Sequence, residues 1–140
     1  MRSIFLPYLR DIRFSGDTGK DADLFLRAHA LYGTADHCRD VALEARRLAA
    51  CLGAGKARAE KAGWLHDISA VIPSSQRVQL ARALEIEVLP EEAACPMILH
   101  QKISARMASE IFCIQDMDIC SAIGCHTTLK AGASTLDKVV

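Results

Sequence analysis

The stretch AGWLHDISAVIP, residues 62–73, carries the feature on which the interpretation of this chain depends. Its first half continues an apolar pattern that predicts a helix over about 56–68. His66 and Asp67 stand side by side near the end of that helix. Neighbouring residues point about 100° apart on an ideal helix, so the two side chains converge on one metal only if the helix end or the side chains adjust. The apolar positions of this helix are Ala59, Ala62, Leu65 and Ile68.

Helical patterns extend in both directions from this stretch. Alanine and leucine dominate the composition and β-branched residues are sparse, which favours an all-α fold of one domain over residues 1–140. A helix is expected over about 36–52, where Thr34 or Asp36 could form the N-cap. Its apolar positions are Val41, Ala45, Leu48 and Leu52. Further helices are expected over about 21–32, from a turn at 73–75 to about 85, and over about 97–112, 116–126 and 135–140, with a loop or short turn between Pro90 and Pro96.

Composition and charge exclude several classes of function. The formal net charge is zero and no basic stripe is present, so neither nucleic acid nor a membrane surface is expected as a partner. Without a signal peptide or an apolar run of membrane-spanning length, we expect a cytoplasmic protein. The six cysteines lack the spacing of a zinc or redox motif, and we expect them to be reduced and mostly buried.

Four of the five histidines are expected in or at the end of apolar helices. His37 falls in the first turn of its helix, and His66, His100 and His126 each follow an apolar triplet or near-triplet. A single such histidine is more often a structural residue than a ligand. The polar groups of four such histidines and of Asp67 are best satisfied by a partner that they share, and a pair of divalent metal ions is the simplest such partner. Imidazole and carboxylate donors without cysteine suit Fe, Mn, Zn, Ni or Co, and Asp67 could bridge two ions that activate water and clamp a phosphoryl group.

The order His37, His66-Asp67, His100, His126 resembles the H…HD…H…H pattern of HD-domain phosphohydrolases. The segments HCRDVALEARRLA, MILHQKISARMA and AIGCHTTLKAGASTLDKVV, together with the stretch at 62–73, are similar to the bacterial YqeK family of symmetrical bis(5′-nucleosyl)-tetraphosphatases. The similarity runs over about 22–140. It implies an HD-domain helical bundle and hydrolysis of diadenosine tetraphosphate to two ADP. It also implies a centre of two metal ions, with iron preferred, whose ligands are His37, His66, Asp67, His100 and His126.

The chain departs from the family pattern at two places. Ala70 stands where many HD proteins have a phosphate-binding lysine, so Lys102 and Lys130 are candidates for that role, Lys102 also for a catalytic one. The family's late aspartate ligand would lie beyond Val140, and the last helix looks incomplete. On that interpretation we expect substoichiometric metal binding and slow turnover. Arg39, Thr127 and Thr128 are further candidates for contact with a nucleotide substrate.

Two alternatives to the tetraphosphatase remain open. The chain could be an HD phosphohydrolase that acts on other nucleotides, because one fold hosts several phosphate substrates. It could also be a truncated module that binds nucleotide or metal without turnover, and exposed apolar surface would then favour a homodimer. His29 matches no motif and is expected to be structural or exposed.

Overall fold

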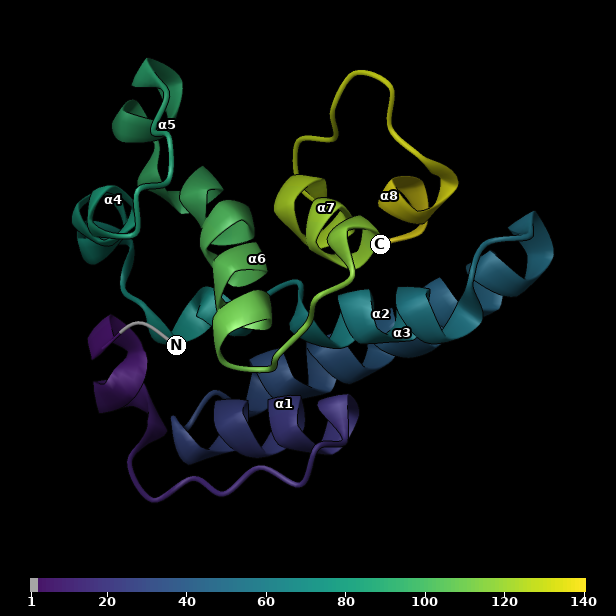
Figure 1. Ribbon diagram of the computed structural model, residues 1–140, viewed down its shortest axis with the longest axis horizontal. Helices are drawn as coiled ribbons and strands as arrows, with labels where there is room; N and C mark the ends of the chain where they lie inside the picture. The colour runs from purple at the N-terminus through teal and green to yellow at the C-terminus, as the bar shows by residue number, and fades with distance from the viewer. Residues whose placement is uncertain (1–2) are drawn as a thin grey trace.

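The computed structural model describes residues 3–140, and over that range every regular element is a helix, which confirms the all-α prediction (Figure 1). The consecutive helices α2 and α3 pack along each other, while α6 and α7 lie across them. The short 3₁₀ helices are η1 (Ser3–Leu9), η2 (Ile68–Val71) and η3 (Pro96–Leu99). The α-helices are α1 (Thr18–Ala28), α2 (Tyr32–Leu52), α3 (Lys56–Leu65), α4 (Ser74–Ala83), α5 (Pro90–Ala94), α6 (His100–Glu110), α7 (Met117–Cys125) and α8 (Thr135–Val139).

Helices α2 and α3 pack closely because the face of α2 that meets α3 carries small side chains. A Cβ atom added to Gly63 of α3 would lie 2.5 Å from the Cα atom of Ala42, so the backbones almost touch there. The expected apolar face of α2 is confirmed at Ala45, which is buried, and in part at Leu48, which packs against the core, whereas Leu52 at the end of the helix is 60% exposed. Small residues that allow close approach, rather than the larger aliphatic ones, form the buried stripe. Its members are Ala35, Cys38, Ala42, Ala45 and Ala49.

The start of α2 also differs from the expectation. The helix begins at Tyr32 after Leu31, which offers no side-chain cap, so neither Thr34 nor Asp36 is the N-cap. The Asp36 carboxylate instead accepts a hydrogen bond of 2.7 Å from Arg27 of α1. An ion pair between α1 and α2 thus takes the place of the expected cap. Because α2 begins at Tyr32, before the expected start at about 36, His37 lies in its second turn rather than in its first.

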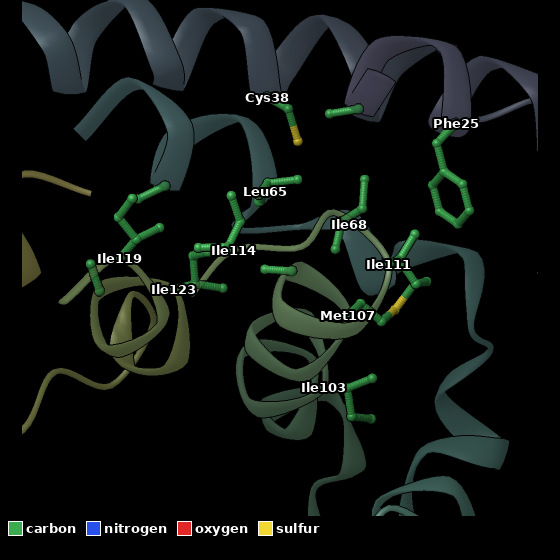
Figure 2. Packing of buried hydrophobic residues seen from close by; sticks show 14 of the residues in the cluster. Phe25, Cys38, Leu65, Ile68, Ile103, Met107, Ile111, Ile114, Ile119 and Ile123 are labelled. Atoms are coloured by element: carbon green, nitrogen blue, oxygen red, sulfur yellow. The ribbon is translucent and has the colours of Figure 1, made fainter. Parts of the chain in front are cut away.

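The core lies between α6 and the layer formed by α1 and α3 (Figure 2). Ile103 and Met107 are fully buried one helical turn apart on α6, and Met107 lies nearer to Ile68 than Ile103 does in Figure 2. Burying side chains of this size contributes about 1.5–3 kcal/mol each. This packing fixes α6 on the rest of the molecule and thereby fixes the position of its first residue, His100.

Several smaller expectations need correction. The segment expected as a loop after Pro90 forms α5, and residues 97–99 belong to the 3₁₀ helix η3 rather than to α6. All six cysteines are free, but only Cys38 and Cys125 are buried, because most of the others lie on outward faces or in connections. Within residues 3–140, no helix combines the length and apolar character that a bilayer crossing needs.

Candidate metal centre

The predicted ligands meet where several helices end. His37 projects from α2, His66 directly follows α3, and Asp67 precedes η2. His100 is the first residue of α6, and His126 directly follows the last residue of α7. Ligands at helix ends belong to different, well-packed elements, so the tertiary fold rather than any one helix sets their separations.

The end of α3 resolves the geometric conflict between His66 and Asp67. The helix stops at Leu65, three residues earlier than expected, and Asp67 has φ −110° and ψ 18°. This backbone conformation lies in the sparsely populated region between helix and strand, where many active-site residues are found. The change of direction lets the Asp67 carboxylate face the same space as the His66 ring.

The two carboxylate oxygens of Asp67 divide the cluster into two groups. Its Oδ2 lies 3.4 Å from His66 Nε2 and 3.9 Å from His37 Nε2. Its Oδ1 lies 3.4 Å from His100 Nε2 and 3.7 Å from His126 Nε2. Within each group the potential ligand atoms all lie within 4.8 Å of one another, so Asp67 can offer one oxygen to each of two cations.

Backbone hydrogen bonds orient three of the four imidazole rings. Nδ1 of His66, His100 and His126 lies 2.7, 2.6 and 2.8 Å, respectively, from the carbonyl oxygen three residues earlier in the chain. A carbonyl only accepts, so each Nδ1 carries the proton. In the neutral ring this leaves the Nε2 lone pair free, which is the tautomer that binds metal.

The Nε2 atoms then face one another at short distances. They are 2.9 Å apart between His100 and His126, and 3.2 Å apart between His66 and His37. Two lone pairs repel each other at this distance unless a proton or a cation lies between them. Metal–nitrogen bonds of about 2.0–2.1 Å place adjacent ligand atoms roughly 3 Å apart. The donor set and its spacing therefore fit a pair of divalent metal ions.

The surroundings shift the pKa values within the cluster in opposite directions. Burial lowers the pKa of His66, but hydrogen bonds to Asp67 and Cys38 outweigh it and raise that pKa to about 10. Burial and the charges of nearby rings lower the pKa of His126 to about 4. For Asp67, burial is outweighed by the hydrogen bond to His66 and by the ring charges, and its pKa falls to about 2. Without metal, a proton on His66 supplies part of the positive charge that the cluster requires.

Two buried serines support the centre, and no sequence motif had indicated them. The Ser69 hydroxyl donates to the backbone carbonyl of His100 at 2.8 Å, and the Ser104 hydroxyl donates to Ser69 Oγ at 2.9 Å. Both serines are fully buried. They tie the segment that carries Asp67 to the helix that carries His100. Polar residues at apolar positions of two helices are the signal that could have revealed them.

Gln101 is a second residue that the motifs did not indicate. Its Oε1 accepts from the Thr127 N–H at 3.0 Å, and its Nε2 donates to Thr128 Oγ1 at 2.9 Å. This side chain holds the turn that follows His126. The Thr127 hydroxyl consequently lies 3.1 Å from His100 Nε2, at the edge of the centre, whereas the Thr128 hydroxyl accepts from Gln101.

The three candidate basic residues bind other partners. The Lys102 ammonium lies 2.8 Å from Oε1 of the buried Glu92, and Lys130 lies 3.5 Å from Oδ2 of the buried Asp137. Arg39 is exposed on α2, where it pairs with two neighbouring aspartates. Their predicted contacts with substrate remain predictions.

Two further residues have local structural roles. Asp137 forms a capping box with Ser134 at the start of α8 and accepts a hydrogen bond from Ser121, so it stands at a helix start and not in the centre. Nδ1 of His29 lies 2.8 Å from the Phe25 carbonyl oxygen, and the His29 ring packs against the Phe25 ring. His29 therefore has a structural role, as expected.

Comparison with known proteins places this arrangement in a family. A curated protein of Lactococcus lactis subsp. cremoris, described as an uncharacterized protein in the pepC 5′region, is 49% identical over 85 residues, which are 61% of this chain and 44% of that protein. The crystal structure of a predicted HD superfamily hydrolase involved in NAD metabolism, from Clostridium acetobutylicum, matches with a TM-score of 0.81 and 25% identity. That match covers 91% of this chain and 66% of the other.

The chain thus spans under half of the curated relative and about two thirds of the solved structure. The family model of the HD domain matches the sequence over residues 34–140, a segment that contains all five predicted ligands. The helical arrangement agrees with the predicted HD-domain bundle. This chain belongs to the HD-domain family.

Proposed function

We propose that the protein is a metal-dependent phosphohydrolase that cleaves diadenosine tetraphosphate symmetrically to two ADP. The observation that carries the proposal is the pair of three-residue groups that share Asp67, in each of which the potential ligand atoms lie within 4.8 Å of one another. HD-family membership and the similarity to an HD superfamily hydrolase support hydrolysis in general. The resemblance of the sequence to the symmetrical tetraphosphatases supports this substrate.

Each residue of the centre has a distinct part in this proposal. His37, His66 and Asp67 Oδ2 would hold one ion, and Asp67 Oδ1, His100 and His126 the other. We propose iron for both, although imidazole and carboxylate donors also suit Mn, Zn, Ni and Co. When bound, two such ions activate water and withdraw electron density from phosphoryl oxygens. The protein contributes the orientation of the rings through the three Nδ1–carbonyl hydrogen bonds.

The substrate contacts would lie next to the second ion. Lys102, Thr128 and Lys130 line one cavity together with Gln101 and Cys125, the chain neighbours of His100 and His126, and an ammonium group there could exchange its carboxylate partner for a phosphate. The Thr127 hydroxyl at the edge of the centre could donate to the same phosphate chain. Arg39 lies two residues after His37 on α2, where it pairs with Asp36 and Asp40, and it would have to leave these partners to contact a phosphate.

A second candidate substrate follows from the Clostridium protein, which is described as involved in NAD metabolism. NAD, like diadenosine tetraphosphate, joins two nucleosides through phosphates. An HD phosphohydrolase that acts on NAD would use the same metal centre as a tetraphosphatase. The products released from each nucleotide therefore distinguish the two candidate substrates.

A nucleotide panel with metal analysis tests the proposal. Metal-loaded protein should release ADP as the dominant product from diadenosine tetraphosphate. Asp67→Ala should lose most of the bound metal and turnover, because second-shell changes alone weaken metal binding by roughly 10–100-fold and this carboxylate is shared by both groups. Glu44→Ala, which removes an exposed carboxylate from α2, serves as the control and should keep both.

Other products would contradict the assignment in different ways. AMP with ATP would exclude symmetrical cleavage, and preferential hydrolysis of NAD would favour the second candidate. Metal-loaded protein that turns over none of the panel would indicate a module that binds without catalysis. Equal metal content in the wild type and Asp67→Ala would exclude the centre itself.

A further inference from the structure

Arg77 on α4 is a buried arginine that no sequence motif had indicated. Only 8% of the residue is exposed, although a guanidinium keeps its charge in proteins and is costly to bury. Burial lowers the pKa of Arg77, and the charge of Asp67 acts against this shift. The guanidinium thus interacts electrostatically with the carboxylate that the two halves of the centre share.

The guanidinium donates to two backbone carbonyls that lie next to candidate ligands. Its Nε donates to the Ile72 carbonyl oxygen at 3.2 Å, and its Nη1 donates to the Met97 carbonyl oxygen, also at 3.2 Å. Ile72 directly follows η2, which begins after Asp67. Met97 belongs to η3, which ends immediately before His100. One planar group therefore joins the two short 3₁₀ helices that adjoin Asp67 and His100.

The Met97 carbonyl oxygen is shared between Arg77 and His100. His100 donates to this oxygen through its backbone N–H and through Nδ1, which lies 2.6 Å away. The Met97 side chain is 58% exposed, so its packing does little to fix the peptide group. The hydrogen bond from Arg77 consequently holds the carbonyl on which the orientation of the His100 ring depends.

The acceptors of the other two oriented rings are held differently. The carbonyls of Gly63 and Ile123, which His66 and His126 contact through Nδ1, belong to α-helices of ten and nine residues. The 3₁₀ helix η3 has only four residues, and the hydrogen bonds of a 3₁₀ helix have poorer geometry than those of an α-helix. His100 is therefore the imidazole whose acceptor gains most from a contact outside its own segment.

We propose that Arg77 is a positioning residue of the metal centre, which links η2 to η3 and thereby holds His100 Nε2 near Asp67 Oδ1. These two atoms lie 3.4 Å apart. The proposal rests on the proposed metal-dependent function and adds to it a residue outside the candidate ligands. On this proposal the half of the centre that contains His100 depends on α4, whereas the half that contains His37 does not.

Two variants of Arg77 and one control separate the effect of position from that of charge. Arg77→Met removes the donors and the charge, whereas Arg77→Lys keeps the charge but replaces the planar group with a single ammonium. Arg82→Met is the matched control, because Arg82 is exposed on the same helix. By charge alone, the loss of a cation would strengthen the binding of a divalent ion, so weaker binding after Arg77→Met indicates an effect of position.

The first measurement requires neither metal nor nucleotide. Spectra of ¹⁵N-labelled imidazole rings in the metal-free protein report whether Nδ1 carries a proton. We expect His100 to retain this proton in the wild type and in Arg82→Met, and to lose it in part in both Arg77 variants. His66 and His126 should retain theirs throughout. Circular dichroism identifies the variants that are folded, and Arg77→Lys decides the outcome if Arg77→Met does not fold.

The second measurement addresses the two halves of the centre separately. In a His37→Ala background the remaining half contains His100, and in a His126→Ala background the remaining half contains His37. In calorimetry with Mn²⁺, Arg77→Met should raise the Kd of the first about tenfold, the lower end of the roughly 10–100-fold range for residues that support ligands. It should raise the Kd of the second less than about twofold, and Arg82→Met should change neither.

Three results would each overturn the positioning role. They are an unchanged Nδ1 proton at His100 in the folded Arg77 variants, equal losses of affinity in the two backgrounds, and tighter Mn²⁺ binding after Arg77→Met. A protein that binds no Mn²⁺, but in which the Nδ1 proton of His100 depends on Arg77, would instead reject the proposed metal-dependent function. The role of Arg77 in orienting His100 would then remain.

Discussion

At the scale of single residues, His66 has two roles that compete. Its ring is 5% exposed and its Nδ1 is fixed by the Gly63 carbonyl, so Nε2 is directed at the centre. The hydrogen bonds to Asp67 and Cys38 keep that ring protonated up to a pKa of about 10. A metal ion needs the same Nε2 as a lone pair, and it must therefore displace a proton.

Metal affinity should consequently rise with pH above the ordinary histidine range. The folded pKa of His66 is raised, so below pH 10 the proton competes with the metal, and each displaced proton changes the apparent Kd about tenfold per pH unit. Asp67, with a pKa of about 2, and His126, with a pKa of about 4, are already deprotonated between pH 8 and 9.5 and add no slope. Calorimetry with Mn²⁺ in two buffers of different ionisation enthalpy should give release of about one proton per protein at pH 8.5. A Kd that does not depend on pH in this window would exclude the protonated His66.

At the scale of elements, the contact between α2 and α3 sets the distance between His37 and His66. Gly63 permits the contact, since an added Cβ atom would lie 2.5 Å from Ala42 Cα and 2.8 Å from Ala42 N. Backbone atoms cannot move aside as the end of a flexible side chain can. The separation of the two ligands thus depends on a residue that binds no metal.

Gly63→Ala should destabilise the fold by at least about 2 kcal/mol, because the overpacking penalty exceeds the roughly 0.5–1 kcal/mol gained from alanine in a helix. Gly124→Ala is the matched control, because it also replaces a helical glycine but meets only Ala105 Cβ at 3.6 Å. It should be neutral or stabilising. Urea denaturation of both variants checks the difference, and equal stabilities would contradict the close α2–α3 packing.

At the scale of the whole molecule, the centre joins four segments that are far apart in the chain. His37, the pair at 66–67, His100 and His126 lie on or next to α2, α3, α6 and α7. In the unfolded chain these candidate ligands are separated, so a metal ion held by them would bind the folded state preferentially. Binding and stability are therefore linked.

Metal should raise the melting temperature, and the two halves of the centre should contribute unequally. At a free metal concentration of 100 Kd, one site adds about 2.7 kcal/mol, or roughly 10 °C for a chain of this size. The half with His126 should bind more tightly, because the His126 and His100 side chains are 10% and 15% exposed against 54% for His37. In thermal scans with and without chelator, His126→Ala should lose most of the shift and His37→Ala should keep a substantial part. The reverse order would contradict this ranking.

The sequence by itself determined the fold class and the ligand types. Helical periodicity and an alanine- and leucine-rich composition are local properties, so they indicated helices and most of their approximate positions. The five candidate ligands were indicated because histidines at apolar helix ends are costly without a partner, and because their order resembles a family pattern.

Only the tertiary structure decided the details that depend on distant neighbours. Asp36 pairs with Arg27 of another helix, so the local capping signal at the start of α2 did not apply. The buried face of α2 follows its small residues because α3 approaches closely at Gly63. The serine and glutamine supports, the division of the centre between the oxygens of Asp67, and the hydrogen bond from Arg77 to Met97 all arise from contacts between segments remote in sequence. A local pattern gives the direction of a side chain within its own helix, but the partner that it meets is set by how the helices pack.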